Sequence, residues 1–328
     1  MMGSKLANTY IRDFEGSMGP LMLGILPSIL ARTAYFARKK VSDALEPYYR
    51  AKHDQDPETS DFVRNRTKLI RQYGVPVDEL SKNEVSIMLA ATSNTIPTLF
   101  WYVANIWLRR DLVRDLRAEI TSALNIHHPP TDGSASEITL RLARLESSCP
   151  LLASCFRESV RLTSQIITFR HAREDTTISD GEGHSYLLRA GTTVMMPAKV
   201  VHRHPLIWGH DAEVFNARRF MPSPGSTTSA ADSGDKGKGA DRLRKAAFVP
   251  FGGGRHLCPG RKFAFGENIA FVAALAMGFE IVGLREDRIR MVDSKMGEAA
   301  KPAAGFEGGP VVLSRRKGWE NVTWKFAH

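Results

Sequence analysis

A glycine-rich stretch near the C-terminus, FVPFGGGRHLCPGRKFA at 248–264, holds the residue best suited to chemistry, Cys258. The three glycines at 252–254 permit positive backbone φ angles and let a flat ligand approach the backbone closely. Pro259 follows the cysteine, and we expect a helix to begin there because proline is favoured at the first helical position. The free N–H groups and the dipole of such a helix favour a thiolate over a thiol. Gly260 removes a side chain that would crowd a ligand.

A thiolate in such a loop is a suitable ligand for a haem iron, since it pushes electron density toward O–O cleavage. Phe251 could cover the sulfur and exclude water, which would tune its donor strength. One alternative is an ordinary glycine-rich turn with an incidental buried cysteine. Another is a phosphate-binding loop, but the pattern GxxxxGK[ST] is absent and would not explain Cys258.

Glu158 and Arg161 lie three residues apart in SCFRESVRL, so they share one face of a predicted helix. Most such pairs are solvated surface pairs. Here the apolar neighbours Phe156 and Val160 predict that the pair is partly buried. A buried, multiply bonded guanidinium would make each partner essential for folding.

A largely apolar segment at 77–108 is predicted to form one long helix that crosses the interior. It contains Asn94 and Thr95 shortly before Pro97. Because proline has no N–H, the carbonyl of Ser93 loses its helical partner and the helix should kink. A freed carbonyl beside Thr95 would make a polar notch for dioxygen and a proton-delivering water. The alternative is a kinked core helix whose hydroxyls are satisfied.

The elements that must position these residues are mainly helical. Further helices are expected over 14–50, 109–124, 150–163 and 259–277, and short strands at 166–169, 176–178, 186–188 and 192–196. The polar, low-complexity stretch at 223–245 is predicted to be a disordered insertion, because it cannot bury a core. The pattern predicts a mainly α protein with small β-sheets, in a single domain over 1–328.

The composition excludes several classes of protein. The chain has 328 residues with a net charge of +10, but the basic residues are spread along it and no nucleic-acid-binding motif occurs. Nucleic acid is therefore not an expected partner. The apolar segment at 18–30 is interrupted by two prolines and is too short to span a membrane, which needs about 20 residues. We expect it to form a buried or membrane-surface helix pair.

The remaining cysteines and a histidine group have simpler interpretations. Cys149 and Cys155 form no CxxC pair with each other or with Cys258, which disfavours a disulfide framework, and they are expected to be small buried hydrophobes. His202 and His204, with His210, lack the cysteine or carboxylate partners of a tetrahedral zinc site. We expect these histidines to lie in solvated loops.

The cysteine loop closely resembles the haem-binding signature of the cytochrome P450 family. That signature is an aromatic residue, Gly, any, Gly, any, a basic residue, any, Cys, an apolar residue or Pro, and Gly. Its positions are filled, in order, by Phe251, Gly252, Gly254, His256, Cys258, Pro259 and Gly260. The resemblance implies a thiolate-ligated haem with Cys258 as the axial iron ligand. His256 stands where Arg is commoner and would hydrogen-bond a haem propionate, less firmly because His can be neutral.

The same resemblance assigns roles outside the loop. It makes Arg219 the third partner of Glu158 and Arg161 in a buried ionic triad behind the cysteine loop, and Arg170 a haem propionate ligand. Thr95 looks like the threonine of the oxygen-activation groove. Asn94 stands where the family usually has an acid, so the proton path departs from the usual one. The Asn-Thr-Ile-Pro form resembles the branch of sterol and bile-acid hydroxylases, neighboured by isomerases of the prostacyclin synthase type.

The resemblance implies a haem monooxygenase that inserts one oxygen atom of O₂ into a lipophilic substrate such as a sterol, terpenoid or other secondary metabolite. It also implies an NADPH-dependent flavoprotein reductase, with a basic docking face, and a location on the cytosolic face of the endoplasmic reticulum membrane. The chain itself shows no membrane anchor. Family members are longer at the N-terminus, so the fold is expected to lack its N-terminal part. The alternatives are an isomerase or dehydratase that needs no reductase, a non-catalytic remnant, and an unrelated scaffold protein.

Overall fold

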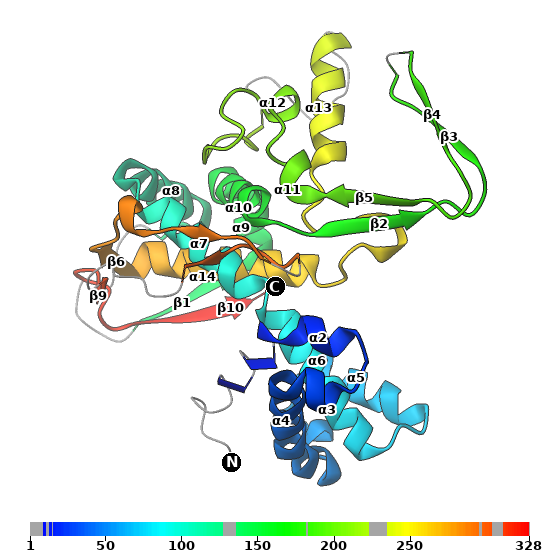
Figure 1. Ribbon diagram of the computed structural model, residues 1–328. Helices are drawn as coiled ribbons and strands as arrows, with labels where there is room; N and C mark the ends of the chain where they lie inside the picture. The colour runs from blue at the N-terminus through cyan, green and yellow to red at the C-terminus, as the bar shows by residue number, and fades with distance from the viewer. Residues whose placement is uncertain are drawn as a thin grey trace. The chain divides into compact units, whose positions relative to one another are not determined.

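The computed structural model of the chain describes residues 9–10, 13–14, 16–126, 136–181, 183–222, 235–294, 297–303 and 311–327. These residues form two compact units, Met1–Asn94 and Thr95–His328. Within them the secondary structure is mainly helical and every sheet has two strands (Figure 1). The prediction of a mainly α protein with small sheets is confirmed. The prediction of a single domain over 1–328 stays a prediction.

The first unit consists of helices joined by short turns. They are α2 (Met18–Met22), α3 (Pro27–Leu30), α4 (Arg32–Arg50), η1 (His53–Gln55), α5 (Asp61–Gln72) and α6 (Val77–Thr92). Helix α4 packs along α6, and small residues such as Ala34 and Ala37 allow the close approach to Val85. Asp54 is buried and is paired with Arg71, whose guanidinium lies 2.9 Å from its carboxylate. None of the helices in the described part of the chain is both long and apolar enough to cross a membrane.

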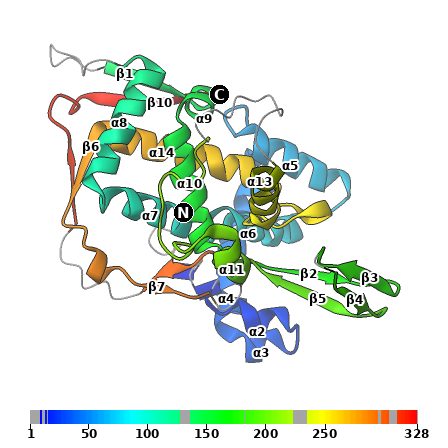
Figure 2. The same cartoon turned by 90° about the horizontal axis from the view of Figure 1, so that it is seen from above.

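The second unit is built around five helices that share one hydrophobic core. These are α7 (Thr95–Trp107), α8 (Arg110–Leu124), α9 (Leu142–Ser148), α10 (Pro150–Thr163) and α14 (Arg261–Gly278). Twelve residues of α10 are buried, and α14 is buried along most of its second half. Helix α10 contacts both α7 and α14 (Figure 2). The two helices predicted to carry the ionic pair and to follow the cysteine therefore pack on each other.

Five two-stranded sheets surround this helical core. The strands are β1 (Ser136–Arg141), β2 (Ile167–His171), β3 (Thr176–Ser179), β4 (Ser185–Leu188), β5 (Thr193–Pro197), β6 (Phe279–Val282), β7 (Met291–Val292), β8 (Lys301–Pro302), β9 (Val312–Arg315) and β10 (Val322–Ala327). The pair β1–β10 is parallel, whereas β2–β5, β3–β4, β6–β9 and β7–β8 are antiparallel. The four strands predicted between 166 and 196 correspond to β2–β5. The β3–β4 hairpin continues from β2 and β5 and extends away from the helices (Figure 1).

Short helices connect the sheets to the core. They are α11 (Ala198–Val201), α12 (Pro205–Trp208), α13 (Asp235–Ala247), η2 (Gly254–His256) and η3 (Glu286–Arg288). Residues 235–247 form α13 and residues 223–234 lie outside the described residues, so the prediction that 223–245 is a disordered insertion stays a prediction. The helix is held because Ala247, at its end, packs in an apolar cluster with Trp208 and Ala212.

The long helix predicted at 77–108 is divided in two. Helix α6 ends at Thr92 and α7 begins at Thr95, with a turn at Ser93 and Asn94 between them. The predicted kink is therefore a break. Pro97 is the third residue of α7, where a backbone N–H has no intrahelical partner in any case, so the proline is tolerated at the start of a new helix.

Candidate functional site

The cysteine loop is a tight turn closed by its own backbone. The N–H of Cys258 donates to the carbonyl of Phe251 over 3.0 Å, which brings the two ends of the loop together. Gly252 and Gly254 have φ angles of +73° and +62°, a region that residues with a Cβ rarely adopt. The Phe251 side chain is partly buried against the main core. The loop geometry thus requires the glycines at these two signature positions.

Cys258 differs from the other two cysteines in its exposure. The residue is partly exposed and its thiol is free, whereas Cys149 and Cys155 are fully buried, as predicted. Burial raises the pKa of both buried thiols to about 12, so neither is a candidate thiolate. A Cβ on Gly260 would lie 3.8 Å from the Cys258 sulfur. Any side chain at Gly260 would therefore cover the sulfur.

The helix after the cysteine begins two residues later than predicted. Helix α14 begins at Arg261 with Gly260 as its N-cap, so Pro259 lies in the preceding turn. The difference arises because Cys258 is held by the loop hydrogen bond to Phe251, which leaves Pro259 and Gly260 to turn the chain. The guanidinium of Arg261 donates to the Cys258 carbonyl over 3.1 Å and closes this turn.

Of the two predicted propionate ligands, Arg170 contacts the loop from β2, and His256 belongs to the loop itself. Arg170 projects from β2, and its guanidinium donates to the carbonyl of Gly253 over 2.8 Å and to that of Phe169 over 2.8 Å. A Cβ on Gly254 would lie 3.5 Å from the same guanidinium. His256 is exposed at the tip of the loop, in η2. Whether Arg170 and His256 hold propionates stays a prediction.

The predicted ionic triad is assembled as a buried network. The two carboxylate oxygens of Glu158 each accept a hydrogen bond of 2.8 Å from the Arg161 guanidinium. Arg219 donates to the same carboxylate over 3.0 Å, and so does the backbone N–H of Asn216. Glu158 and Arg161 are fully buried. A buried carboxylate is stable here because two guanidiniums and a backbone N–H together satisfy its charge and its lone pairs.

Asp211 is a fourth member of this network that the sequence analysis missed. Its carboxylate lies 2.9 Å from the Arg219 guanidinium, which also donates to the carbonyl of Trp208 over 2.6 Å. The hydrogen bonds from Arg219 lower the pKa of Asp211 to about 2, so the carboxylate is charged over the physiological range. Arg161 stacks over the Trp208 ring at 5.1 Å.

His202 also departs from the sequence analysis, which placed it in a solvated loop. It is fully buried between α10 and the segment that enters the cysteine loop, whereas His204 and His210 are exposed as predicted. Its ring nitrogens contact the carbonyl of Arg161 and the N–H of Val249. Spacing alone gave no signal for this burial, because the turn after α11 folds inward on Trp208.

The two predicted oxygen-groove residues lie at the break between α6 and α7. Thr95 is the first residue of α7 and is partly buried, and Asn94 precedes it and is exposed. Helix α7 packs on α10 and on α14, which follows Cys258. Thr95 therefore stands at the start of a helix that contacts both α10, which carries Glu158 and Arg161, and α14, which follows Cys258. The roles of Thr95 and Asn94 in oxygen activation stay predictions.

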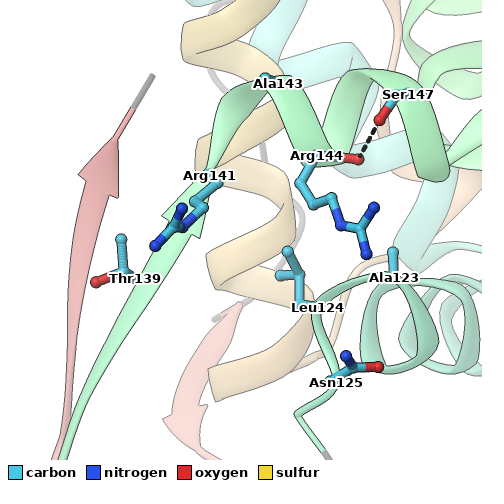
Figure 3. Close-up of a pocket in the computed structure, with 8 residues that line it drawn as sticks. All are labelled: Ala123, Leu124, Asn125, Thr139, Arg141, Ala143, Arg144 and Ser147. Carbon is cyan, nitrogen blue, oxygen red and sulfur yellow. Dashed lines mark hydrogen bonds between the residues drawn. The ribbon is translucent and has the colours of Figure 1, made fainter.

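A separate pocket of about 510 Å³ lies between α8, β1 and α9 (Figure 3). None of the predicted site residues contributes to its wall. The residues that line it are Ala123, Leu124, Asn125, Thr139, Arg141, Ala143, Arg144 and Ser147. The arginines at its rim are exposed. This pocket is not part of the candidate site.

The residues of the cysteine loop fit a thiolate-ligated haem. The only partly exposed cysteine in the described part of the chain stands in a loop that carries no side chains at 252–254. Leu257 in the loop is 38% exposed, and Phe263 in the adjoining helix is 65% exposed. Such exposed apolar side chains are expected of residues that contact an apolar ligand. The soft sulfur donor suits iron.

The comparisons with known proteins agree with this geometry. A family model described as Cytochrome P450 matches residues 16–307. The chain is 35% identical over 322 residues to a cytochrome P450 monooxygenase of Gibberella zeae and 30% identical over 317 residues to the cytochrome P450 monooxygenase nodJ of Hypoxylon pulicicidum. It is 28% identical over 264 residues to cytochrome P450 7A1 of Rattus norvegicus. The chain therefore belongs to the cytochrome P450 family.

The matched lengths differ between this chain and its relatives. The two fungal matches cover 96% of this chain but 58% of each relative, and the rat match covers 80% of this chain and 50% of the relative. The chain thus spans a little over half the length of the curated relatives that it matches. The matched part includes Thr95, the Glu158 network and the cysteine loop.

Proposed function

We propose that the protein is a haem-thiolate monooxygenase that inserts one oxygen atom of O₂ into a lipophilic substrate, such as a sterol, terpenoid or other secondary metabolite. The single observation that carries the proposal is the free, partly exposed Cys258 sulfur on a loop whose two glycines adopt positive φ. Glu158 and Arg161 are fully buried in α10, which packs on α14, the helix that follows the loop. Two fungal relatives, whose matches cover 96% of the chain, carry the name monooxygenase.

In this proposal the haem, when bound, supplies the oxygen chemistry. Cys258 would hold the haem iron through its sulfur, and Gly260 would leave the space beside the sulfur open. Phe251 shields the sulfur from water on the core side. His256 and Arg170 hold the propionates, Arg170 from a position where it already contacts the loop backbone. These residues bind and orient the group, and they set the polarity around the ligand.

In this proposal, Thr95 and Asn94 would control proton delivery on the substrate side. A threonine hydroxyl can both accept and donate a hydrogen bond, so Thr95 can hold a proton-delivering water. The Asn94 amide can orient such a water but cannot relay a proton as a carboxylate does. We expect Thr95→Val to lower product formation per NADPH consumed, because proton delivery fails while haem binding remains. Thr98→Val, also on α7, is the matched control.

The proposal requires electrons from an NADPH-dependent flavoprotein reductase. Lys245, Arg255, Arg261 and Lys262 are exposed around the cysteine loop, and they suit an acidic surface of the reductase. Oxygen uptake that depends on reductase and NADPH, together with oxygenated product, supports the proposal. If reductase-dependent reduction of the bound haem shows no decrease between low and high salt, the basic docking face is contradicted.

Asn94 favours one alternative function, an isomerase or dehydratase that uses no reductase. Without a carboxylate beside Thr95, a reaction that needs no external protons is chemically suitable. The two functions separate in one assay: the alternative turns over without NADPH and takes up no oxygen. Asn94→Asp sharpens the test, since it should improve coupling in a monooxygenase and leave an isomerase unchanged. A third possibility, a remnant without activity, predicts no haem uptake.

We further propose that α2 and α3 contact a membrane surface, on the cytosolic face of the endoplasmic reticulum. Six apolar side chains in these helices and their turn have 60–71% of their surfaces exposed, namely Met22, Leu23, Ile25, Leu26, Ile29 and Leu30. Such a cluster is typical of interfacial helices. The full chain should sediment with anionic vesicles, and Leu26→Asp with Ile29→Asp should abolish it. Equal sedimentation of both proteins contradicts the proposal.

A further inference from the structure

His202 belongs to none of the sequence motifs and has no role in the proposed haem site. It follows α11, which contacts α10 and leads away from β5 (Figure 1). Its side chain is fully buried. The ring lies almost parallel to Phe248, with centroids 5.7 Å apart and an angle of 28°, and edge-on to Trp208 at 6.3 Å. An imidazole in this position is desolvated on both faces, so its two nitrogens must find partners within the protein.

Both ring nitrogens of His202 have such partners. The backbone N–H of Val249 points at Nε2 over 3.1 Å, so Nε2 is the acceptor. Nδ1 lies 3.0 Å from the carbonyl of Arg161, so Nδ1 carries the proton and donates it to that oxygen. The two contacts define one neutral tautomer. A protonated ring would place an N–H against the Val249 N–H and lose the acceptor.

The backbone of His202 is tied to the ionic network as well. Its carbonyl accepts a hydrogen bond from the Arg161 guanidinium. Burial, followed by the positive charges of Arg161 and Arg203, lowers the pKa of His202 to about 4. The charged groups that face the ring therefore both oppose protonation. His202 thus remains neutral, with one end fixed to α10 and the other to Val249.

Val249 is where the chain enters the cysteine loop. Beyond it, the carbonyl of Pro250 accepts a longer bond of 3.4 Å from Ser164 at the end of α10. Two residues of the loop entrance are therefore held by side chains, Val249 by His202 and Pro250 by Ser164, and the His202 contact is the shorter one. The exit of the loop is tied back to its entrance through the Cys258 N–H and the Phe251 carbonyl.

We infer that His202 is a positioning residue for the cysteine ligand: it transmits the rigid geometry of the Glu158–Arg161 network to the loop that carries Cys258. This inference rests on the proposed haem-thiolate function. His202 does not touch the reacting atoms. It acts by fixing the Val249 backbone, so that the loop between Val249 and Cys258 keeps one conformation and the sulfur keeps one place.

Three substitutions separate hydrogen bonding from packing. His202→Phe keeps a flat ring against Phe248 but removes both hydrogen bonds. His202→Asn can replace only the Nδ1 contact, because its amide is too short to reach Val249. His202→Gln is longer, and its amide oxygen can replace the Nε2 acceptor. The exposed His204→Gln is the matched control.

Two readouts are measured on the full chain. The first is the amide hydrogen exchange rate of Val249, compared with that of buried Val272 in α14, which reports unfolding of the core. The second is the fraction of haem-loaded protein whose reduced carbon monoxide complex shows a thiolate-type Soret band. We expect His202→Phe and His202→Asn to speed exchange at Val249 by about tenfold relative to Val272, and to lower the thiolate fraction. His202→Gln should recover both, and the control should match the wild type.

The possible failures are distinguishable. If the wild-type chain takes up haem with a thiolate band and all variants match it, the positioning role is wrong while the proposed function stands. Faster Val249 exchange without loss of the thiolate fraction, or the reverse, also overturns it, because the two effects must move together. If the wild-type chain never shows a sulfur-ligated haem, the proposed function itself fails, and the positioning role fails with it.

Discussion

The two sides of the cysteine loop differ in what stabilises them. Behind the loop, Glu158, Arg161 and His202 are fully buried, and each polar atom of the Glu158 carboxylate is paired within the chain. In front of it, Cys258 is partly exposed and His256 is exposed. The charged groups behind the loop are paired within the chain. In the part of the chain that the structure describes, Cys258 and His256 in front of the loop have no interaction of comparable strength.

This difference separates folding from function. The back of the loop is a network of buried charges, which is strongly destabilised when one partner is removed. The front contains glycine turns with positive φ angles and a free, partly exposed thiol, which suit a ligand site. We therefore expect substitutions behind the loop to change the free energy of unfolding, and substitutions in front of it to change haem binding.

The largest stability effect is expected from Glu158→Gln. The substitution leaves the buried Arg161 guanidinium without a counter-ion and removes one of the two carboxylates that pair with Arg219, and breaking such a buried pair costs about 3–5 kcal/mol. Urea unfolding of the haem-free chain measures the loss. Glu146→Gln, on the exposed surface of α9, is the matched control and should stay within about 0.5 kcal/mol of the wild type. Equal urea midpoints for Glu158→Gln and Glu146→Gln would contradict a stabilising role of the network behind the loop.

The pH dependence of stability tests the neutral state of His202. The folded protein keeps the ring unprotonated down to about pH 4, whereas the unfolded chain takes up a proton near the ordinary value of 6.5. Between these values the unfolded state binds more protons, so the free energy of unfolding decreases as the pH falls. This group should contribute a loss of about 3 kcal/mol between pH 7 and pH 4.

Urea unfolding at several pH values measures this loss, with His202→Phe as the reference. The variant has no titrating group at the position, so its stability should fall less over the same range. Asp211 has a folded pKa of about 2 and loses its contribution at lower pH, in both proteins alike. Parallel curves for the wild type and the variant between pH 6.5 and pH 4 would refute the buried neutral histidine.

A smaller effect is expected from Arg219→Lys, which keeps the charge. Lysine cannot reproduce the fork that joins Glu158, Asp211 and the Trp208 carbonyl, so charge-assisted hydrogen bonds are lost at a cost of about 2 kcal/mol. Thermal unfolding measures the loss. Arg218→Lys is the neighbouring control, since its side chain is 62% exposed and its pair with Asp115 lies at the surface. A control loss as large as the Arg219→Lys loss would contradict the assignment.

The glycines of the loop give the smallest and most local contrast. Gly252 and Gly254 have positive φ angles, so alanine at either position should cost about 1–2 kcal/mol. Gly253 has an extended φ of −168° with nothing near its Cβ position, so Gly253→Ala should be nearly neutral in stability. Thermal unfolding of the haem-free variants compares the three. Equal losses at all three positions would show that the loop conformation is different.

The sequence predicted the parts of the site that depend on local spacing. The shared helix face of Glu158 and Arg161 and the glycine turns each follow from a few neighbouring residues, because backbone geometry decides them. Near Pro97 the sequence predicted a kink in one long helix, whereas the structure has a break between α6 and α7. The helix start at Arg261 was displaced from Pro259 by a hydrogen bond between Cys258 and Phe251. Such a bond depends on how the loop closes, which spacing does not reveal.

The parts that were missed depend on tertiary packing. His202 looked like a solvated loop residue, because its burial arises only when the turn after α11 folds against Trp208 and Phe248. Asp211 has no motif of its own and becomes part of the network through Arg219. In each case, distant residues decided the outcome.

The most direct test of the account is the absorption spectrum of the reduced carbon monoxide complex, recorded on the full chain supplied with haem. The account predicts a thiolate-type, red-shifted Soret band in the wild type that is lost in Cys258→Ser and unchanged in Cys149→Ser, a buried cysteine in the core. A wild-type chain that takes up haem without that band, or a band that survives Cys258→Ser, would contradict the assignment of Cys258 as the iron ligand.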